Sequence, residues 1–145
     1  MQFITNSAEE TELIGERLCK AILERGDERA FIAMRGEMGV GKTAFVRGFA
    51  RALGIRGVKS PTYTIVNEHR GERRLFHFDM YRIESSDDLY SIGFDDYVSA
   101  RGYSSAEWSE NVEDELPPWR ITVTVERSQK DENERIITIS DGIRL

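Results

Sequence analysis

The chain has little cysteine and no long hydrophobic stretch. Its 145 residues include one cysteine, Cys19, which excludes an intramolecular disulfide and a CxxC metal or redox motif. No apolar stretch approaches the length of a membrane span, and the first eleven residues lack the basic start and apolar segment of a signal peptide. These absences predict a protein of the cytoplasm that does not contact a membrane.

An excess of positive charge is also missing. The chain carries 26 acidic and 20 basic residues, for a formal net charge of -6, which argues against a general affinity for the nucleic acid backbone. We therefore expect any contact with RNA to be local or made through a partner. With 39% hydrophobic residues and three prolines, the composition is typical of one ordered domain spanning residues 1–145.

The first half of the chain contains an apolar segment, a glycine-rich loop and a helical pattern in direct succession. Residues 31–34 form a short apolar run of the kind expected for a strand buried on both faces. Residues 36–43 read G-E-M-G-V-G-K-T, and apolar residues then recur at helical intervals up to a stop at Gly54. This is the complete G-x-x-x-x-G-K-[ST] pattern of a phosphate-binding loop in its required context.

Each fixed position of this pattern has a role in holding a nucleotide. Glycines let the backbone wrap closely, so that successive amides and the start of the next helix face phosphate oxygens. Lys42 would place a positive charge between the terminal phosphates, and Thr43 would offer a hydroxyl to Mg²⁺. The predicted ligand is ATP with Mg²⁺, and the alternative is a strand-to-helix turn that binds nothing. The residues predicted to surround the phosphates are Glu37, Met38, Gly39, Val40, Gly41, Lys42 and Thr43.

A phosphate-binding loop also needs an acidic residue at the end of a neighbouring strand, to hold the metal directly or through water. Asp79 fits this requirement because it follows the apolar residues 75–78. An aspartate at the tip of such a strand would otherwise be costly near the core. The alternative for Asp79 is a helix cap or a surface salt bridge.

The remaining patterns predict how the domain is built. Ser7 and Glu10 form a capping box that starts a helix ending near Gly26, with its apolar face made by Leu13, Ile14, Leu18, Ala21 and Ile22. Residues 63–66 and 75–78 predict an antiparallel hairpin, residues 87–97 a short helix and turn, and residues 121–125 and 136–139 a second strand pair. Together they predict an α/β fold, a three-layer P-loop NTPase-like domain with a mixed central sheet flanked by helices.

Sequence elements that mark other classes of P-loop protein are absent, and this narrows the possible functions. The D-x-x-G and N-K-x-D elements usual in guanine-specific switches do not occur, which disfavours a regulatory GTPase. No arginine-rich lid segment of a small nucleotide kinase is evident. An ATPase is therefore favoured, while a small-molecule phosphotransferase and a non-hydrolysing nucleotide-sensing module stay open as alternatives.

Four segments together resemble one family over almost the whole chain. They are residues 36–43, residues 60–68 (S-P-T-Y-T-I-V-N-E), residues 77–82 (H-F-D-M-Y-R) and the pair Glu107-Trp108. The combination resembles the TsaE (YjeE) family, bacterial ATPases that serve in threonylcarbamoyladenosine modification of transfer RNA. The resemblance implies an ATPase that hydrolyses slowly alone, has TsaD and TsaB as partners, and meets tRNA only indirectly through that complex.

The resemblance also implies roles for individual residues. Lys42 would hold the phosphates, Thr43 and Asp79 would serve Mg²⁺, and Glu107 would act at the metal or on the attacking water. The catalytic set is thus Lys42, Asp79 and Glu107. The metal-binding set is Thr43, Asp79 and Glu107.

Three threonines are added by the same resemblance. Thr62 and Thr64 lie in a switch-type loop that can close over the γ-phosphate, and Thr11 lies near the nucleotide base. From the residues alone, Thr62 and Thr64 are equally explained by strand propensity.

Several neighbours of these residues have ordinary explanations. For His77, which lies inside an apolar strand, a hydrogen-bonded packing role is favoured over metal ligation or base catalysis. For Trp108 a core or interface role is favoured. Arg82 is as well explained by a salt bridge as by a phosphate contact. Two features depart from the family pattern: Val40 is larger than the usual loop residue, and residues 102–106 are more polar than the strand expected before Glu107.

Overall fold

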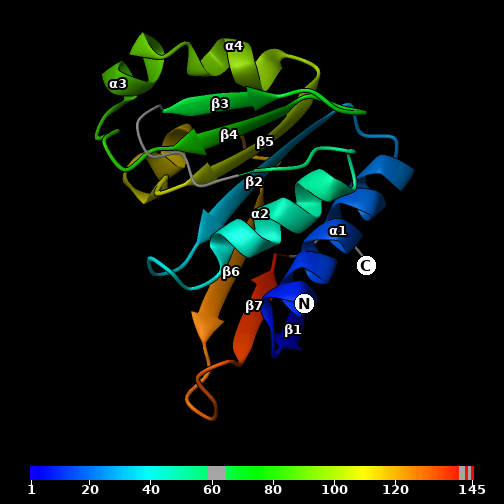
Figure 1. The fold of residues 1–145 in the computed structure, drawn as a ribbon. Helices are drawn as coiled ribbons and strands as arrows, with labels where there is room; N and C mark the ends of the chain where they lie inside the picture. Colours follow the sequence, from blue (N-terminus) through cyan, green and yellow to red (C-terminus); the bar gives the residue numbers. More distant parts are fainter. Residues whose placement is uncertain (59–64, 141–142, 144) are drawn as a thin grey trace.

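The central sheet contains strands from both ends of the chain. The structure, a computed structural model, describes residues 1–58, 65–140, 143 and 145. Within those residues, seven strands form one sheet in the order β1-β7-β6-β2-β5-β4-β3 (Figure 1). The strands are β1 (Gln2–Thr5), β2 (Arg29–Arg35), β3 (Val66–His69), β4 (Leu75–Asp79), β5 (Gly102–Glu107), β6 (Ile121–Arg127) and β7 (Arg135–Ile139).

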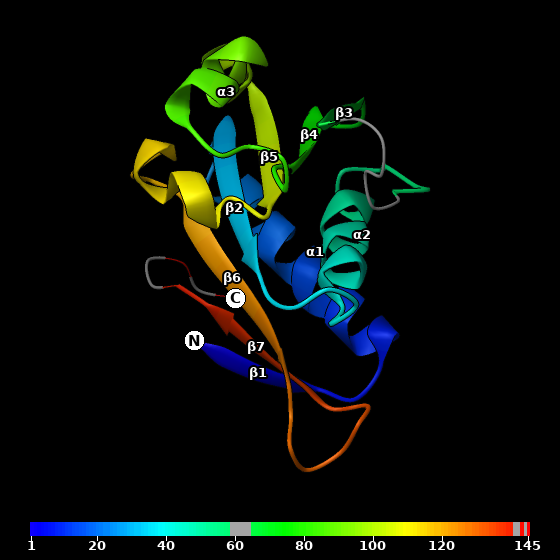
Figure 2. The same ribbon diagram turned by 90° about the vertical axis from the view of Figure 1, so that its left-hand side faces the viewer.

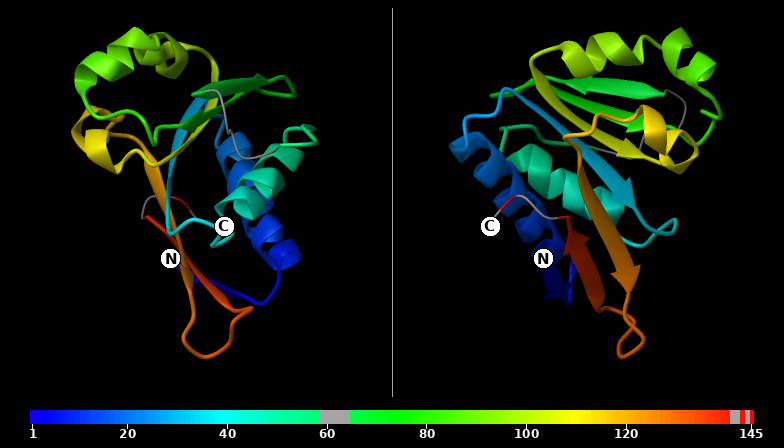
Figure 3. Two further views of the ribbon diagram at one scale, coloured as in Figure 1. Left: turned by 60° about the vertical axis from the view of Figure 1, so that its left-hand side comes forward. Right: turned by 180° about the vertical axis from the view of Figure 1, so that it is seen from behind.

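The sheet is mixed, as predicted. Its centre is parallel, with β2 paired to β5 and β6, and β4 paired to β5. Both sides end in antiparallel pairs, β3 with β4 on one side and β1, β7 and β6 on the other (Figure 3). Parallel strands need crossover segments, and the helices supply them on both faces of the sheet.

Helices cover the sheet on two sides and make three layers (Figure 2). They are α1 (Ala8–Glu24), α2 (Lys42–Arg51), α3 (Ser86–Ser91), α4 (Phe94–Ser99) and the 3₁₀ helix η1 (Glu110–Glu115). Alternate residues of β2 enter two different cores, because successive side chains point to opposite faces. Ile32 and Met34 pack with α1 and α2, whereas Phe31 and Ala33 pack with α3, α4 and η1. The predicted three-layer α/β fold is therefore confirmed.

The first helix begins and ends where the sequence predicts. The Ser7 hydroxyl accepts a hydrogen bond from the Glu10 amide at 3.1 Å, and Gly26, just beyond the helix, has a left-handed φ of 80°. The prediction was wrong for Leu13, whose side chain is 53% exposed, since α2 packs on the face that carries Ile14 and Leu18.

The single cysteine, Cys19, is fully buried in the α1 face of the core. Burial raises the pKa of its thiol to about 12. Because the thiolate is the reactive form, this environment makes Cys19 an inert packing residue, in agreement with the absence of a second cysteine.

Two glycines allow α1 and α2 to pack closely. A Cβ on Gly15 would lie 2.1 Å from the Phe45 carbonyl oxygen, and one on Gly48 would lie 1.8 Å from the Glu12 carbonyl oxygen. Both contacts are with backbone, which cannot rotate away as a side chain can. The position of the helix that follows the glycine loop is therefore fixed by backbone contact with α1.

We expect Gly48→Ala to lower the free energy of unfolding by about 2–4 kcal/mol, measured by urea denaturation, because the helices must separate. Helix propensity alone would make the same change stabilising by about 1 kcal/mol. Gly26→Ala is the control. Gly26 has a left-handed φ, but nothing lies within 4 Å of an added Cβ, so this change should lower the free energy of unfolding by only about 1 kcal/mol. A Gly48→Ala protein as stable as the wild type would contradict this account of the packing.

Two strand predictions need correction. The first predicted strand, residues 63–66, overlaps the observed β3 only at Val66, and Ile65 lies in a bend. Residues 63 and 64 lie outside the described residues. β3 is an edge strand, half exposed and paired on one side only, so it can contain polar residues. Its sequence V-N-E-H therefore lacks the apolar pattern by which a strand is predicted.

The second correction concerns residues 102–106, whose polarity weakened the expectation of a strand before Glu107. They form β5, a fully buried strand between β2 and β4. Small serines fit between neighbouring strands, and the Tyr103 hydroxyl donates a hydrogen bond to the Asp27 carbonyl at 2.7 Å. Glu107 is therefore carried by a central strand of the sheet. None of the helices in the described part of the chain is long and apolar enough to cross a membrane.

Candidate nucleotide-binding site

The candidate site lies where three parallel strands end. The glycine loop follows β2, Asp79 ends β4 and Glu107 ends β5. The register pairs Asp79 with Glu107 and Glu107 with Met34, so both carboxylates stand beside the start of the loop. The carboxyl edge of a parallel sheet is the usual place for a ligand in an α/β fold.

The loop adopts the backbone conformation that its glycines predict. Gly36, Gly39 and Gly41 all have positive φ, at 139°, 74° and 119°. A Cβ at Gly36 would also lie 2.4 Å from the Val125 carbonyl oxygen. Both the positive φ and this close contact therefore exclude larger residues at Gly36. Val40, the loop residue that departs from the family pattern, is buried and its side chain packs in the core.

Two arginines from the β6–β7 hairpin hold the loop in place through hydrogen bonds to its backbone. The Arg135 side chain donates to the Val40 carbonyl at 2.8 Å, and Arg127 donates to the Gly39 carbonyl at 3.3 Å. These contacts join segments about 90 residues apart in the chain, at separations of 95 and 88 residues. Both contacts are made to backbone carbonyls of the loop and do not involve its side chains.

The start of α2 is left open to an anion. Its N-cap, Gly41, has no side chain to accept from the first-turn amides, and its first turn has no acidic residue. In α1, by contrast, Ser7 caps the helix and Glu9 and Glu10 occupy the first turn. The amides and the positive end of the α2 dipole are therefore not compensated by the helix's own side chains, as a phosphate site requires.

Lys42 is almost completely buried, at 5% exposure, beside this helix start. Its Nζ donates to the Gly36 carbonyl at 2.7 Å, lies 3.8 Å from Glu107 Oε1 and stands 4.3 Å from the centre of the Trp108 ring. A buried ammonium group is stable only with such partners. The amine is thus held at the inner wall of the loop, where it can turn to an anionic ligand.

Trp108 has a strained backbone directly after Glu107. Its φ of 61° makes it the one residue other than glycine with positive φ in the described part of the chain. Its ring also packs edge to face on Tyr81, with the centroids 5.5 Å apart. A left-handed bulky residue costs roughly 1–2 kcal/mol, and such strain collects at functional sites.

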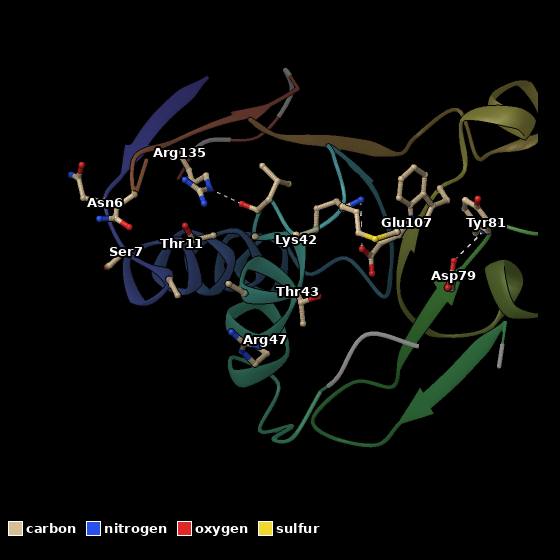
Figure 4. A pocket seen from close by; sticks show the side chains of 18 of the residues that line it. Asn6, Ser7, Thr11, Lys42, Thr43, Arg47, Asp79, Tyr81, Glu107 and Arg135 are labelled. Carbon is tan, nitrogen blue, oxygen red and sulfur yellow. Dashed lines mark hydrogen bonds and ion pairs between the residues drawn. The ribbon is translucent and has the colours of Figure 1, made fainter. Parts of the chain in front are cut away.

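A cavity of about 740 Å³ runs along the loop and the start of α2. Thr11, Asn6, Ser7 and Arg135 lie at one end, Asp79, Glu107 and Tyr81 at the other, with Lys42 and Thr43 between them (Figure 4). Its size falls within the range of small-molecule sites. The cavity therefore has a lysine at its middle, two carboxylates at one end, and hydroxyl, amide and guanidinium groups at the other.

The polar end is built around Thr11 on α1. Its hydroxyl is buried and shares a 2.8 Å hydrogen bond with the Thr5 hydroxyl at the end of β1. Thr11 lines the same cavity as the glycine loop, and its place near a nucleotide base stays a prediction. With its hydroxyl engaged by Thr5, Thr11 is placed to present its methyl group or its remaining hydrogen-bonding capacity to a ligand.

At the acidic end the two carboxylates differ in their surroundings. Asp79 Oδ1 accepts from the Tyr81 amide at 3.0 Å and is partly exposed. Glu107 is buried, and its Oε2 lies 3.1 Å from His77 Nε2. Oxygen donors of this kind suit Mg²⁺, which usually combines one or two carboxylates with substrate phosphates. No group of three or more His, Cys, Asp or Glu side chains that could hold a metal occurs among the described residues.

Most of the residues predicted for the site line this cavity. They are Thr11, Met38, Gly39, Val40, Gly41, Lys42, Thr43, Asp79 and Glu107. Glu37 does not line it: its side chain is exposed, and its carbonyl accepts from the Val40 amide at 3.3 Å. Thr62 and Thr64 lie outside the described residues.

Sequence reasoning missed the contribution of the β6–β7 hairpin, from which Asn133 and Arg135 line the cavity. No local motif marks these residues. Arg82, for which a salt bridge and a phosphate contact were equal alternatives, lines the cavity with an exposed side chain. It forms no ion pair with any other residue in the parts of the chain described above.

Several known proteins are similar to this chain in sequence and in fold. The family model "Threonylcarbamoyl adenosine biosynthesis protein TsaE" matches residues 5–137. The chain is 37% identical over 140 residues to the "tRNA threonylcarbamoyladenosine biosynthesis protein TsaE" of Bacillus subtilis, covering 95% of this chain and 85% of that protein. The protein of the same name from Treponema pallidum is 34% identical over 137 residues, covering 94% and 98%.

A solved structure extends the comparison to three dimensions. The crystal structure of YdiB from Bacillus subtilis superposes with a TM-score of 0.77 at 31% sequence identity, covering 96% of this chain and 83% of that one. The similarity in fold therefore extends over almost the whole chain.

Proposed function

Because the chain belongs to the TsaE family of threonylcarbamoyl adenosine biosynthesis proteins, we propose that it is a Mg²⁺-dependent ATPase that supports tRNA N6-threonylcarbamoyladenosine modification. The biosynthetic pathway follows from the family. ATP binding, hydrolysis and the partners are the finer part of the proposal, and they are argued here from the site.

The observation that carries the proposal is the buried amine of Lys42 at an open helix start. A lysine is rarely buried unless an anion or other partner is close. Here its Nζ has the Gly36 carbonyl as its one hydrogen-bond partner among the described residues, with Glu107 farther away at 3.8 Å. The amine retains donors for a second ligand, and the uncapped amides of α2 surround the same place. A triphosphate satisfies all of these groups at once.

The residues present also fit Mg²⁺. Thr43, at the second position of α2, and Asp79 and Glu107, at the ends of β4 and β5, all line the cavity and offer only oxygen donors. When bound, Mg²⁺ would offset the negative charge that develops on the phosphate during hydrolysis. Asp79 would hold the ion directly or through water, and Glu107 would act either at the ion or on the attacking water.

We further propose that TsaD- and TsaB-like proteins are the partners and that tRNA is met only through their complex. The net charge of -6 supports this, because a protein of this charge attracts the nucleic acid backbone poorly. ATP hydrolysis would then change the conformation of the complex rather than modify RNA directly. The setting is the cytoplasm, where both ATP and tRNA are found.

Single-turnover hydrolysis of ATP, with and without the TsaD- and TsaB-like proteins of the same organism, tests the proposed activity. We expect slow, Mg²⁺-dependent phosphate release alone and faster release with the partners. Tight ATP binding without hydrolysis in both conditions would instead identify a nucleotide-sensing module. Transfer of the phosphate to a nucleoside or metabolite from a panel would identify a phosphotransferase.

The partners are tested separately by a pull-down from native lysate, performed with and without ATP. Recovery of TsaD- and TsaB-like proteins in an ATP-dependent manner is expected. The matched bait is a Lys42→Ala protein, for which the amount of each partner recovered should not change when ATP is added. Recovery of neither partner by the wild-type bait would remove this part of the proposal.

A further inference from the structure

We propose that His77 is a positioning residue for Glu107, and that its imidazole fixes which oxygen of the carboxylate faces the glycine loop. The hydrogen bond itself is independent of the nucleotide. The kinetic consequence rests on the proposed ATPase function. The hydrogen-bonded packing role favoured for His77 from the sequence agrees with this contact, and the proposal adds that the contact orients a residue of the site.

His77 is completely buried in the middle of β4, and its one hydrogen bond to a described residue is with Glu107. The two oxygens of Glu107 have different partners. Oε2 lies 3.1 Å from His77 Nε2, and Oε1 lies 3.8 Å from Lys42 Nζ. A carboxylate with one oxygen held from behind has its other oxygen directed to a defined place.

The strand register explains how the two side chains meet. In the pairing of β4 with β5, His77 stands opposite Ser105, and Asp79 stands opposite Glu107. Residues two apart on a strand share a face, so His77 and Glu107 are diagonal neighbours on one face. β5 lies between β2 and β4, and β4 lies between β5 and β3, so both strands are paired on two sides, which gives this contact a rigid frame.

The surroundings also determine which nitrogen carries the proton. A carboxylate only accepts hydrogen bonds, so Nε2 must be the donor. Nδ1 is buried and has no hydrogen-bond partner among the residues that the structure describes. A proton on Nδ1 would therefore be a buried, unsatisfied donor, which is costly. The geometry points to the Nε2–H tautomer.

Holding Glu107 in one orientation has a purpose at this site. A glutamate side chain has three rotatable bonds, and the neighbouring ammonium of Lys42 would attract it into a close ion pair if it were free to move. The bond to His77 retains it at 3.8 Å from that ammonium. Groups that orient functional carboxylates in this way typically change activity by about 10- to 100-fold when removed.

The hydrogen bond is tested by ¹⁵N NMR of the imidazole rings in the wild-type protein, which has only two histidines to distinguish. We expect His77 to show a protonated Nε2 and an unprotonated Nδ1. Glu107→Ala should abolish this fixed preference and leave the His69 signals unchanged. An Nδ1–H tautomer in the wild type, or a His77 spectrum insensitive to Glu107→Ala, would overturn the proposal whether or not the protein hydrolyses ATP.

The positioning role is tested by kinetics. His77→Leu should lower kcat by about 10- to 100-fold with KM for ATP changed less than about threefold, and His77→Gln, which retains a donor near the Nε2 position, should recover much of the rate. Ser105→Ala is the matched control, because it alters a buried polar neighbour in the same row and should leave kcat unchanged.

A double-mutant cycle separates positioning from general destabilisation. In a Glu107→Gln background, His77→Leu should have little further effect on kcat, because the two residues act as one unit. Independent, multiplicative losses in kcat would contradict the role, as would equal effects of His77→Leu and Ser105→Ala. Thermal melting curves would show that each variant is folded. Absence of turnover in the wild type would refute the ATPase instead, and the NMR result would still decide the hydrogen bond.

Discussion

Lys42→Ala should weaken the binding of ATP with Mg²⁺ by about 100-fold or more, equivalent to roughly 3 kcal/mol. The reason is the location of the amine. Lys42 is 5% exposed and held at the inner wall of the glycine loop, where no bulk water would screen its attraction to a phosphate. Isothermal titration calorimetry on the folded variant measures this loss directly.

The matched control is Lys20→Ala. Lys20 also lies on a helix and pairs with Glu16 at 2.9 Å, but its side chain is 59% exposed on α1 and does not line the cavity. An exposed pair of this kind contributes little, so ATP affinity should stay within about twofold of the wild type. Equal affinities of the Lys42→Ala protein and the wild type would show that the loop does not hold the phosphates.

Asp79→Asn should reduce Mg²⁺-dependent turnover by at least about 100-fold while changing ATP affinity much less. Asp79 Oδ1 accepts a hydrogen bond from the Tyr81 amide at 3.0 Å, and an asparagine oxygen can accept the same bond. The turn after β4 should therefore survive, and the variant loses only the negative charge that a metal requires. Phosphate release measured across a range of Mg²⁺ concentrations separates the two effects.

Asp88→Asn provides a close control for this change. Asp88, like Asp79, is a partly exposed aspartate whose carboxylate accepts a backbone hydrogen bond, in its case from the Glu84 amide at 3.0 Å, and it lies outside the cavity. Its turnover should equal that of the wild type. Normal Mg²⁺ dependence in the Asp79→Asn protein would exclude Asp79 from the metal site.

The parts of this site that the sequence predicted are those governed by local rules. Positive φ at Gly36, Gly39 and Gly41 needs glycine, and the loop pattern records that need within eight residues. The Ser7 cap and the acidic residue after an apolar strand are equally local signals. Family resemblance added Glu107 and Thr11, whose local patterns are too weak to identify them.

What could not be predicted depends on contacts between distant segments. Arg127 and Arg135 brace the loop from a hairpin that follows it by more than 85 residues, at separations of 88 and 95. The strand β1 was not predicted, because four residues with one side paired to β7 leave too little pattern. A hydrogen bond was expected for His77, but its partner, Glu107, follows only from the register of β4 and β5.

Polarity misled the sequence reasoning in two strands for opposite reasons. In β3 polar residues occur because the strand is at the edge of the sheet. In β5 they occur at the centre, where Ser104, Ser105 and Glu107 are all buried. Burying polar residues on a central strand costs free energy, and such departures from local rules are expected at functional sites.

Calorimetric titration of the purified, folded protein with ATP in magnesium buffer tests the central claim most directly. The arrangement of the glycine loop, the uncapped start of α2 and the buried Lys42 predicts uptake of one ATP per chain. The titration must be lost in the Lys42→Ala protein and retained in the Lys20→Ala protein. Failure of the wild-type protein to bind ATP or any other nucleotide would contradict the claim that the glycine loop and Lys42 form a nucleotide-binding site.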